Sequence, residues 1–144
     1  MSAKQLSVFL ENAPGSLADF CAVLEKNDIN MRAMCLAESQ DFGLLRFVTD
    51  DAEAANAVLK KEGFICAVSE IIAVEIEDKA GSLTKILSVI GNAGINLEYS
   101  YAFLSKNADK AYSVLKVSDA EAGEKVLCES GIRTIEQEEF EKLF

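Results

Sequence analysis

The sequence contains the same short pattern twice, with the copies 66 residues apart. Asn-Ala-Pro-Gly-Ser-Leu at residues 12–17 is matched by Asp-Lys-Ala-Gly-Ser-Leu at residues 78–83. When residues 6–37 are placed on residues 72–103 without a gap, eight of the thirty-two positions are identical. A period this long, seen only twice, indicates a duplicated small domain, because a solenoid needs about three or more repeats to bury a continuous core.

The duplication divides the 144-residue chain into two predicted domains, residues 1–70 and residues 71–144. A domain of this size buries a small core, so we expect the two halves to pack against each other. Hydrophobic residues make up 50% of the chain, which excludes a disordered protein. No apolar run approaches the roughly 18 residues of a membrane span, and no signal-peptide pattern precedes the first predicted strand. We therefore expect a cytoplasmic protein without a membrane partner.

Acidic residues outnumber basic residues in both halves of the chain. The formal net charge is −10, from 14 Lys and Arg against 24 Asp and Glu. Nucleic acids are bound by clustered Lys and Arg, which displace counterions from the phosphates. The charge therefore argues against a nucleic-acid partner and is typical of a dispersed cytosolic protein.

The chain has no histidine, and none of its four cysteines belongs to a Cys-x-x-Cys pair. The missing histidine removes the usual general base, the histidine-assisted Ser and Cys nucleophiles, and the commonest zinc ligand. Cys21 and Cys128 fall at apolar positions of predicted helices, where a free cysteine behaves as a small buried side chain. We expect reduced core cysteines, no catalytic residue, no metal site and no cofactor, and hence a protein that is not an enzyme.

Hydrophobic periodicity predicts the same order of elements in both halves. Alternating apolar residues predict strands at 6–10 and 72–76, and apolar residues at helical spacing follow in 17–24 and 83–90. Further strands are expected at 31–38, 44–49 and 64–70, and again at 97–104, 112–118 and 132–138, with a turn at 105–107. Asp51 and Asp119 precede alanine-rich helices that end near Gly63 and Gly131. The order in each half is β-α-β-β-α-β, which is the ferredoxin-like pattern.

The repeated loop between strand and helix has the chemistry of an amino-acid site. Its glycine allows close approach of a ligand, and the free N–H groups of the following helical turn can bind a carboxylate. Asn12 or Asp78 can bind an ammonium group, and the amides of Asn30 and Asn96 can both donate and accept hydrogen bonds. A purely structural interpretation also fits, because Asn12 and Asp78 can cap the helices and Asn30 and Asn96 can form turns.

These residues resemble the ACT domain family, whose members share this fold. The family pattern is Asp or Asn, then Pro-Gly and an aliphatic residue before the first helix, and Ile-Asn after it. The resemblance implies regulatory binding of amino acids or other small ligands where two ACT units lie side by side. It implies two ferredoxin-like units packed side by side into an eight-stranded antiparallel sheet with the helices on one face, in which the strands after Asn30 and Asn96 meet.

The resemblance also implies which residues bind the ligand, since the glycine loop of one unit faces the Asn-bearing strand of its neighbour. The predicted ligand-binding residues are Asn12, Pro14, Gly15, Ser16, Leu17, Asn30, Met31, Asp78, Ala80, Gly81, Ser82, Leu83, Asn96 and Leu97.

The two predicted sites differ in their chemistry. One combines the loop 12–17 with Asn96 and Leu97, and the other combines the loop 78–83 with Asn30 and Met31. In the second copy Ala80 replaces proline, and Tyr99 and Tyr101 stand where the first copy has smaller residues. We therefore expect the two sites to bind a ligand unequally.

The function predicted from these features is that of a non-catalytic regulatory module binding a free amino acid between two ACT domains. The alternative is an interaction subunit that docks on a separate enzyme of amino-acid metabolism and has no ligand of its own. Either function is compatible with a homodimer.

Overall fold

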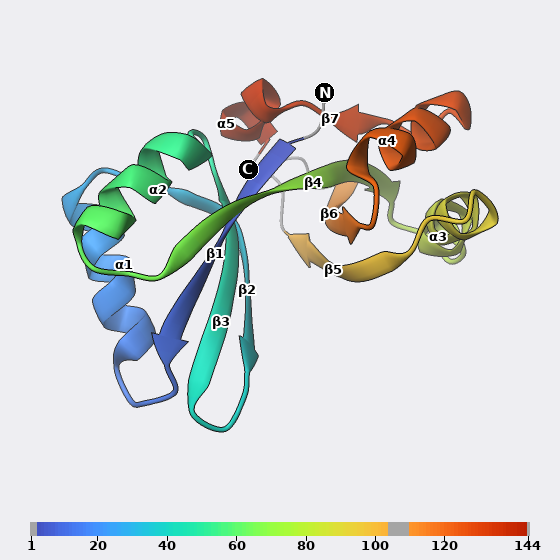
Figure 1. Cartoon of the computed structure of the whole chain (residues 1–144). Helices are drawn as coiled ribbons and strands as arrows, with labels where there is room; N and C mark the ends of the chain where they lie inside the picture. Colours follow the sequence, from blue (N-terminus) through green and yellow to red (C-terminus); the bar gives the residue numbers. More distant parts are fainter. Residues whose placement is uncertain (1–2, 104–109, 144) are drawn as a thin grey trace. The chain divides into compact units, whose positions relative to one another are not determined.

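The structure of the protein is a computed structural model, and it describes residues 3–103 and 110–143 (Figure 1). The chain divides into two compact units. The first unit consists of residues Gln5–Ser69, and the second consists of the residues from Glu70 onward together with the start of the chain up to Lys4. Each unit combines helices with an antiparallel sheet, which confirms the predicted α+β class. The predicted turn at 105–107 and the expected strand end at 104 lie outside the described residues.

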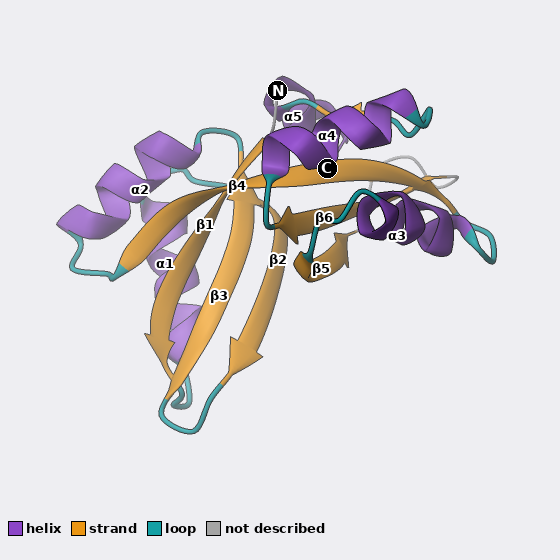
Figure 2. Ribbon diagram, turned by 45° about the vertical axis from the view of Figure 1, so that its right-hand side comes forward, coloured by secondary structure: helices purple, strands orange, loops and turns teal. Residues whose placement is uncertain are grey.

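The first unit contains most of β1 (Ala3–Glu11), α1 (Ser16–Lys26), β2 (Met31–Glu38), β3 (Phe42–Thr49), α2 (Ala52–Lys61) and the beginning of β4 (Cys66–Glu77). β3 pairs antiparallel with β1 and with β2, so that both Val8 and Leu36 lie opposite Leu45. On the other side of β1, the N–H of Phe9 donates to the carbonyl of Ile65 at 3.0 Å. Figure 2 shows α1 and α2 on one side of these strands.

The core of the first unit lies between this sheet and its two helices. Alternate residues of β1, among them Leu6 and Val8, are fully buried on the face that the helices cover, as the period-two pattern predicts. Phe20 of α1 makes edge-to-face contacts with Phe47 and Phe64, with ring centroids 5.8 Å and 5.1 Å apart. Aromatic pairs of this geometry stabilise a core beyond their buried area.

The second unit contains the remainder of β4, α3 (Ser82–Asn92), β5 (Leu97–Phe103), β6 (Lys110–Val117), α4 (Ala120–Glu129), β7 (Thr134–Ile135), a 3-10 turn η1 (Gln137–Glu139) and α5 (Phe140–Leu143). β6 pairs with β4 and β5, and β7 pairs with β4. Its core is aliphatic and includes Ile72, Ile86, Ile90, Leu115 and Leu127. Asp51 and Asp119 cap α2 and α4 as predicted, accepting hydrogen bonds from the N–H groups of Ala54 and Ala122.

The described residues form seven strands, so the expected number of eight is wrong. The last strand of the first unit and the first strand of the second unit are one continuous strand, β4. No glycine or proline interrupts residues 66–77, and consequently no turn forms at the expected join near residues 70–71. Within their own units, β2 pairs with β3 and β5 pairs with β6, and the expected meeting of β2 with β5 stays a prediction.

The predicted final strand at 132–138 is also too long, because only Thr134 and Ile135 are extended and paired. Glu136 and Glu139 form a reciprocal capping box around η1. The side chain of Gln137 accepts a hydrogen bond from the N–H of Lys4 at 3.0 Å. These polar contacts favour a helical turn over a strand at this end of the chain.

All four cysteines are free thiols, but the expected burial is not uniform. Cys128 is exposed, so its predicted core position is wrong, and Cys21 is only partly buried. Desolvation by burial raises the pKa of Cys66, against a smaller lowering effect of Lys60. Among the helices that the structure describes, none is both long and apolar enough to cross a membrane.

Candidate functional site

The loop before the first helix of each unit has the same backbone conformation. Gly15 and Gly81 are the N-cap residues of α1 and α3, with φ angles of 85° and 88°. Residues with a side chain rarely adopt this left-handed conformation, which explains the glycine in both copies. A Cβ added at either glycine would meet no described atom within 4 Å. Backbone conformation, and not lack of room, therefore requires glycine here, and a β-branched residue would destabilise the loop itself.

Asn12 and Asp78 do not cap the helices that follow them. Within the described parts of the chain, no side chain accepts a hydrogen bond from the first turn of α1 or α3. The Nδ2 group of Asn12 donates to the carbonyl of Ser39 at 3.1 Å, and Asp78 is exposed. The capping interpretation of these two residues is therefore wrong, and Asn12 connects the loop to the turn between β2 and β3.

The first helical turns present N–H groups that an anion could bind. The N–H of Ser16 donates to the carbonyl of Ala13 at 3.2 Å, and the N–H of Ser82 points to the carbonyl of Lys79 at 3.4 Å. The next N–H groups, those of Leu17 and Leu83, have no acceptor inside the helix, because no earlier turn exists to supply one. The positive end of the helix dipole favours a negative charge at the same place.

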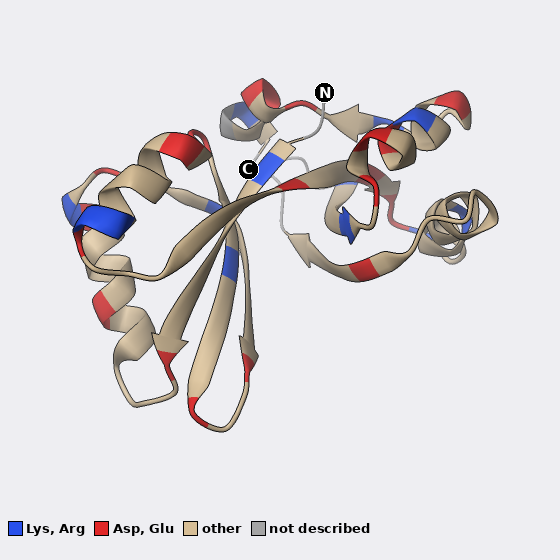
Figure 3. Ribbon diagram, viewed as in Figure 1, with Lys and Arg blue, Asp and Glu red and all other residues tan. Residues whose placement is uncertain are grey.

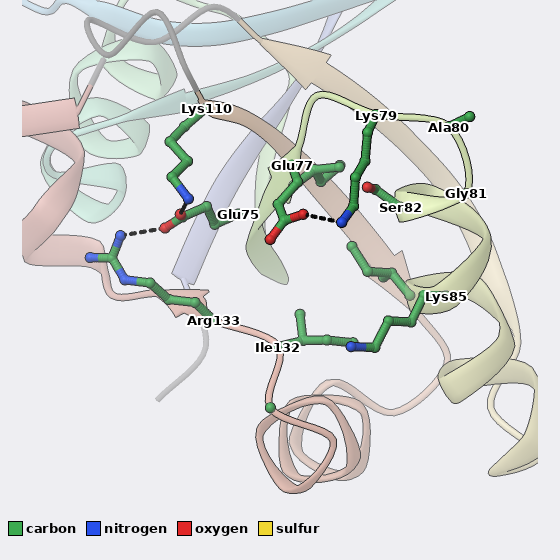
Figure 4. A pocket seen from close by; sticks show the side chains of 13 residues that line it. Glu75, Glu77, Lys79, Ala80, Gly81, Ser82, Lys85, Lys110, Ile132 and Arg133 are labelled. Carbon is green, nitrogen blue, oxygen red and sulfur yellow. Dashed lines mark hydrogen bonds and ion pairs between the residues drawn. The ribbon is translucent and has the colours of Figure 1, made fainter.

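In the second unit this loop forms one wall of a cavity of ≈ 400 Å³. Ala80, Gly81 and Ser82 line the wall, and the rest of the lining comes from β4, α3, β6 and the segment between α4 and β7 (Figure 4). A cavity of this size is in the range of small-molecule sites, roughly 300–1,000 Å³. Its charged lining residues are Glu75, Glu77, Lys79, Lys85, Lys110 and Arg133.

Ion pairs arrange one side of this cavity. The carboxylate of Glu75 contacts the guanidinium of Arg133 at 2.6 Å and the ammonium of Lys110 at 2.9 Å. The hydrogen bond from Arg133, followed by that from Lys110, lowers the pKa of the Glu75 carboxyl. Arg133 also pairs with Glu139. We call Glu75, Lys110 and Arg133 the ion-pair cluster.

A second ion pair lies in the loop itself. Glu77 contacts the ammonium of Lys79 at 2.7 Å, and both side chains are largely exposed. The hydrogen bond and charge of Lys79 lower the pKa of Glu77, and Lys110 and Lys85 lower it further. Both carboxylates in the cavity are therefore ionised and already paired with cations.

A different cavity, of ≈ 390 Å³, lies in the first unit next to the start of β2. Its wall includes Asn30 and Met31, together with Glu25 and Asp28. The carbonyl of Asn30 accepts a hydrogen bond from Thr49 Oγ1 at 2.8 Å, which fixes the start of β2. This cavity has two acidic lining residues and no basic one, so its charge is opposite to that of the cavity beside α3.

The corresponding residues of the second unit, Asn96 and Leu97, also begin a strand. The N–H of Asn96 donates to Ser118 Oγ at 3.1 Å, and its carbonyl accepts from the N–H of Ser118 at 2.9 Å. Leu97 packs against the core of its unit. Tyr101 of β5 is buried, and Tyr99 is partly buried.

The structure thus brings only part of the predicted set together. Ala80, Gly81 and Ser82 share one cavity, and Asn30 and Met31 share another. Asn12, Pro14, Gly15, Ser16 and Leu17 form the equivalent loop of the first unit, and Asp78 and Leu83 lie beside the lining of the cavity next to α3 without being part of it. The combination of a loop from one unit with a strand from the other stays a prediction.

Sequence reasoning missed the charged side chains that shape the cavity beside α3. The sequence does contain a signal for them, at aligned positions of the repeat where the two copies have different residue types. Phe9 aligns with Glu75, and Asp19 aligns with Lys85. These changes from apolar to acidic and from acidic to basic mark positions where the two copies have different roles. In residues 3–103 and 110–143, no group of three or more Cys, Asp or Glu residues is placed to hold a metal ion.

The chain belongs to the family described as ACT domain pair, whose family model matches residues 1–144. One similar solved structure is the crystal structure of protein BT0572 from Bacteroides thetaiotaomicron, whose sequence is 34% identical to this chain. The match covers 97% of this chain and 96% of that protein's chain, with a TM-score of 0.90. No catalytic family is indicated by the match, and no curated protein matches the sequence.

Two more distant structures have the same fold. The regulatory subunit of aspartate kinase from Thermus thermophilus, in its ligand-free form, is 14% identical, with 90% of this chain and 93% of that chain covered and a TM-score of 0.63. The regulatory subunit of aspartate kinase from Thermus flavus is 17% identical, with 91% and 94% covered and a TM-score of 0.57. At these identities the likeness concerns the fold alone.

Proposed function

We propose that this chain is a non-catalytic regulatory module that binds a free amino acid at an interface between two ACT units. One observation carries the proposal: the left-handed glycine loop beside α3 opens onto a cavity of ≈ 400 Å³ that has both basic and acidic side chains in its wall. The first-turn N–H groups and the basic side chains suit a carboxylate, and the acidic ones suit an ammonium group.

A thermal-shift screen of the twenty amino acids tests the proposal. A ligand that binds only the native state raises the melting temperature by mass action, so at least one amino acid should stabilise the full chain. The variant Gly81→Asn introduces a residue that tolerates the left-handed conformation but adds a side chain at a position that lines the cavity. It should reduce or abolish the shift.

The matched control is Gly63→Asn. Gly63 also has a positive φ angle, of 92°, with no described atom within 4 Å of an added Cβ; it follows the C-terminal end of α2 and does not line the cavity beside α3. The control variant should pay the same conformational cost and keep the full ligand-induced shift. If none of the twenty amino acids stabilises the chain, the proposed function is wrong.

The alternative function is that of an interaction subunit docking on a separate enzyme of amino-acid metabolism without its own ligand. One observation favours it: the first unit exposes Phe9, Phe42 and Ile65, with 46%, 45% and 71% of their surface accessible. Large exposed apolar side chains are typical of interaction surfaces. We call these three residues the apolar cluster. Substituting all three by serine should leave amino-acid binding unchanged on the first proposal and should remove the partner on the alternative.

A further inference from the structure

The cavity beside α3 contains one cation that the protein does not neutralise. Lys85 projects from α3 toward Ile132, and no dashed interaction reaches it in Figure 4. Among the described residues, the Lys85 side chain makes no hydrogen bond or ion pair. Its charge acts on Glu77, but that carboxylate already contacts Lys79 at 2.7 Å.

The charge of the cavity follows from its ion pairs. Its wall has four cationic side chains and two carboxylates. A third carboxylate, that of Glu139, pairs with Arg133 from outside the wall. With this pair included, one positive charge remains, and it is that of Lys85. A net positive cavity is notable in a protein whose formal net charge is −10.

The equivalent position of the first unit has the opposite charge. Asp19 and Lys85 are the fourth residues after their N-cap glycines, and their N–H groups donate to the carbonyls of Gly15 and Gly81 at 2.9 Å and 3.1 Å. The two side chains therefore start from the same place on the same helical turn. A negative ligand group that Lys85 attracts would be repelled by Asp19.

We propose that Lys85 makes the cavity of the second unit selective for an amino acid with an acidic side chain, by binding the side-chain carboxylate. This inference rests on the proposed function for the amino-acid nature of the ligand, and it adds the ligand's class. An acidic amino acid has two carboxylates and one ammonium group, so its net charge of about −1 near neutral pH balances the charge of Lys85. A neutral amino acid leaves Lys85 uncompensated, and a basic one adds a like charge.

The charges around the cavity indicate where the ammonium group and the α-carboxylate of the ligand bind. Glu77 and Glu75 are ionised, and both line the cavity, so they attract the ammonium group. The first-turn N–H groups after Gly81 suit the α-carboxylate. The second carboxylate then points toward Lys85 and Ile132, away from the ion-pair cluster.

Titration calorimetry on the full chain tests the inference with glutamate and aspartate against their amides, glutamine and asparagine. A hydrogen bond to a charged group corresponds to about 10- to 100-fold in affinity, so the acids should bind about tenfold or more tightly than the amides. The preference should weaken at high ionic strength. Lys85→Gln should remove the preference, and Lys85→Arg should retain it.

The matched control is Lys125→Gln, because Lys125 is an exposed lysine of α4 and does not line the cavity. This variant should bind all four ligands like the unsubstituted chain. Equal binding of acids and amides, or a preference that survives Lys85→Gln, would overturn the inference and leave the proposed function standing. Glutarate has two carboxylates without an ammonium group. If glutarate binds in a Lys85-dependent way while no amino acid binds, the role of Lys85 is supported and the proposed amino-acid function is wrong.

Discussion

The two units differ most at the point where their last strand meets their first. The backbone there is the same, because the N–H of Phe9 donates to the carbonyl of Ile65 and the N–H of Glu75 donates to the carbonyl of Arg133, each at 3.0 Å. The side chains at these positions have opposite character. The first unit has the exposed apolar cluster, and the second has the ion-pair cluster.

The third member of each cluster occupies an equivalent place as well. Phe42 pairs with Glu11 across β1 and β3, and Lys110 pairs with Glu77 across β4 and β6. In the first unit the rings of Phe9 and Phe42 pack edge to face, with centroids 5.5 Å apart. The backbone ladder and the helix-covered core therefore maintain the fold in both units, while side chains on the opposite sheet face can diverge in function.

This divergence is local, because the overall charge of the halves is similar. Acidic residues are distributed over both units (Figure 3). Residues 1–70 have 6 basic and 11 acidic side chains, and residues 71–144 have 8 and 13. The cavity beside α3 and the corresponding residues of the first unit therefore differ because a few side chains are placed differently, and not because the two halves differ in composition.

The largest expected effect concerns the aromatic core of the first unit. Phe20→Ala should lower the free energy of unfolding by about 3–5 kcal/mol, because it removes a fully buried ring that contacts Phe47 and Phe64. Amide hydrogen exchange should show reduced protection of the core amides of the first unit. The matched variant Ile86→Ala, at the equivalent position of α3, should affect the second unit instead. Equal loss of protection in both units for either variant would mean that they do not behave as separate cores.

The ion-pair cluster should contribute less than a core residue. Glu75→Ala leaves Arg133 and Lys110 without their shared carboxylate, and we expect a loss of about 1–2 kcal/mol, reduced by the partial exposure of both cations. The effect should shrink in high salt. Phe9→Ala, at the equivalent position, should have an effect that salt leaves nearly unchanged. Denaturant unfolding at low and high ionic strength separates the two, and a salt-dependent loss for Phe9→Ala would contradict the comparison.

The helix caps offer a test in which the two units should agree. Asp51→Ala and Asp119→Ala each remove the same hydrogen bond, to Ala54 N–H at 3.0 Å and to Ala122 N–H at 3.1 Å. Each should cost about 1 kcal/mol. Unfolding curves of the two variants should therefore be nearly superimposable, and a difference well above that size would show that the units are not equally stable locally.

The smallest expected effect is a pH dependence confined to the second unit. The fold lowers the pKa of Glu75, so it favours the ionised carboxylate. The resulting stabilisation is complete above the pKa of the unfolded state, about 4.3, and is lost as the pH falls through the lower pKa of the folded state. Thermal unfolding of Glu75→Gln should lack this component of the acid response. An unchanged acid response in that variant would show that Glu75 makes no such contribution.

The sequence predicted the fold well where periodicity and caps determine it. The alternation in β1 and the caps Asp51 and Asp119 are local signals, and the structure confirms them. The continuous strand β4 was missed because the duplication suggested a boundary at residues 70–71, although no turn residue lies there. A repeat predicts two closed domains, whereas this chain passes from one unit to the other within a single strand and without a turn.

The site was predicted only in part, for a physical reason. Identical residues of the repeat, such as Gly15 and Gly81, report a shared backbone conformation. The chemistry of the cavity depends on residues in which the copies differ, and these come from β4, α3, β6 and the segment after α4. A single sequence does not show which of its unlike positions meet in space.

The most direct test that glutamate binds in the cavity beside α3 is amide chemical-shift mapping of the full chain titrated with glutamate. If the ligand binds in the cavity beside α3, the largest shifts should fall on the amides of Ala80, Gly81, Ser82, Lys85 and Arg133. The equivalent amides of the first unit, among them Gly15, Asp19 and Ile65, should shift less. Shifts centred on the first unit's loop, or no shifts at concentrations that saturate the thermal response, would contradict the assignment of the ligand to the cavity beside α3.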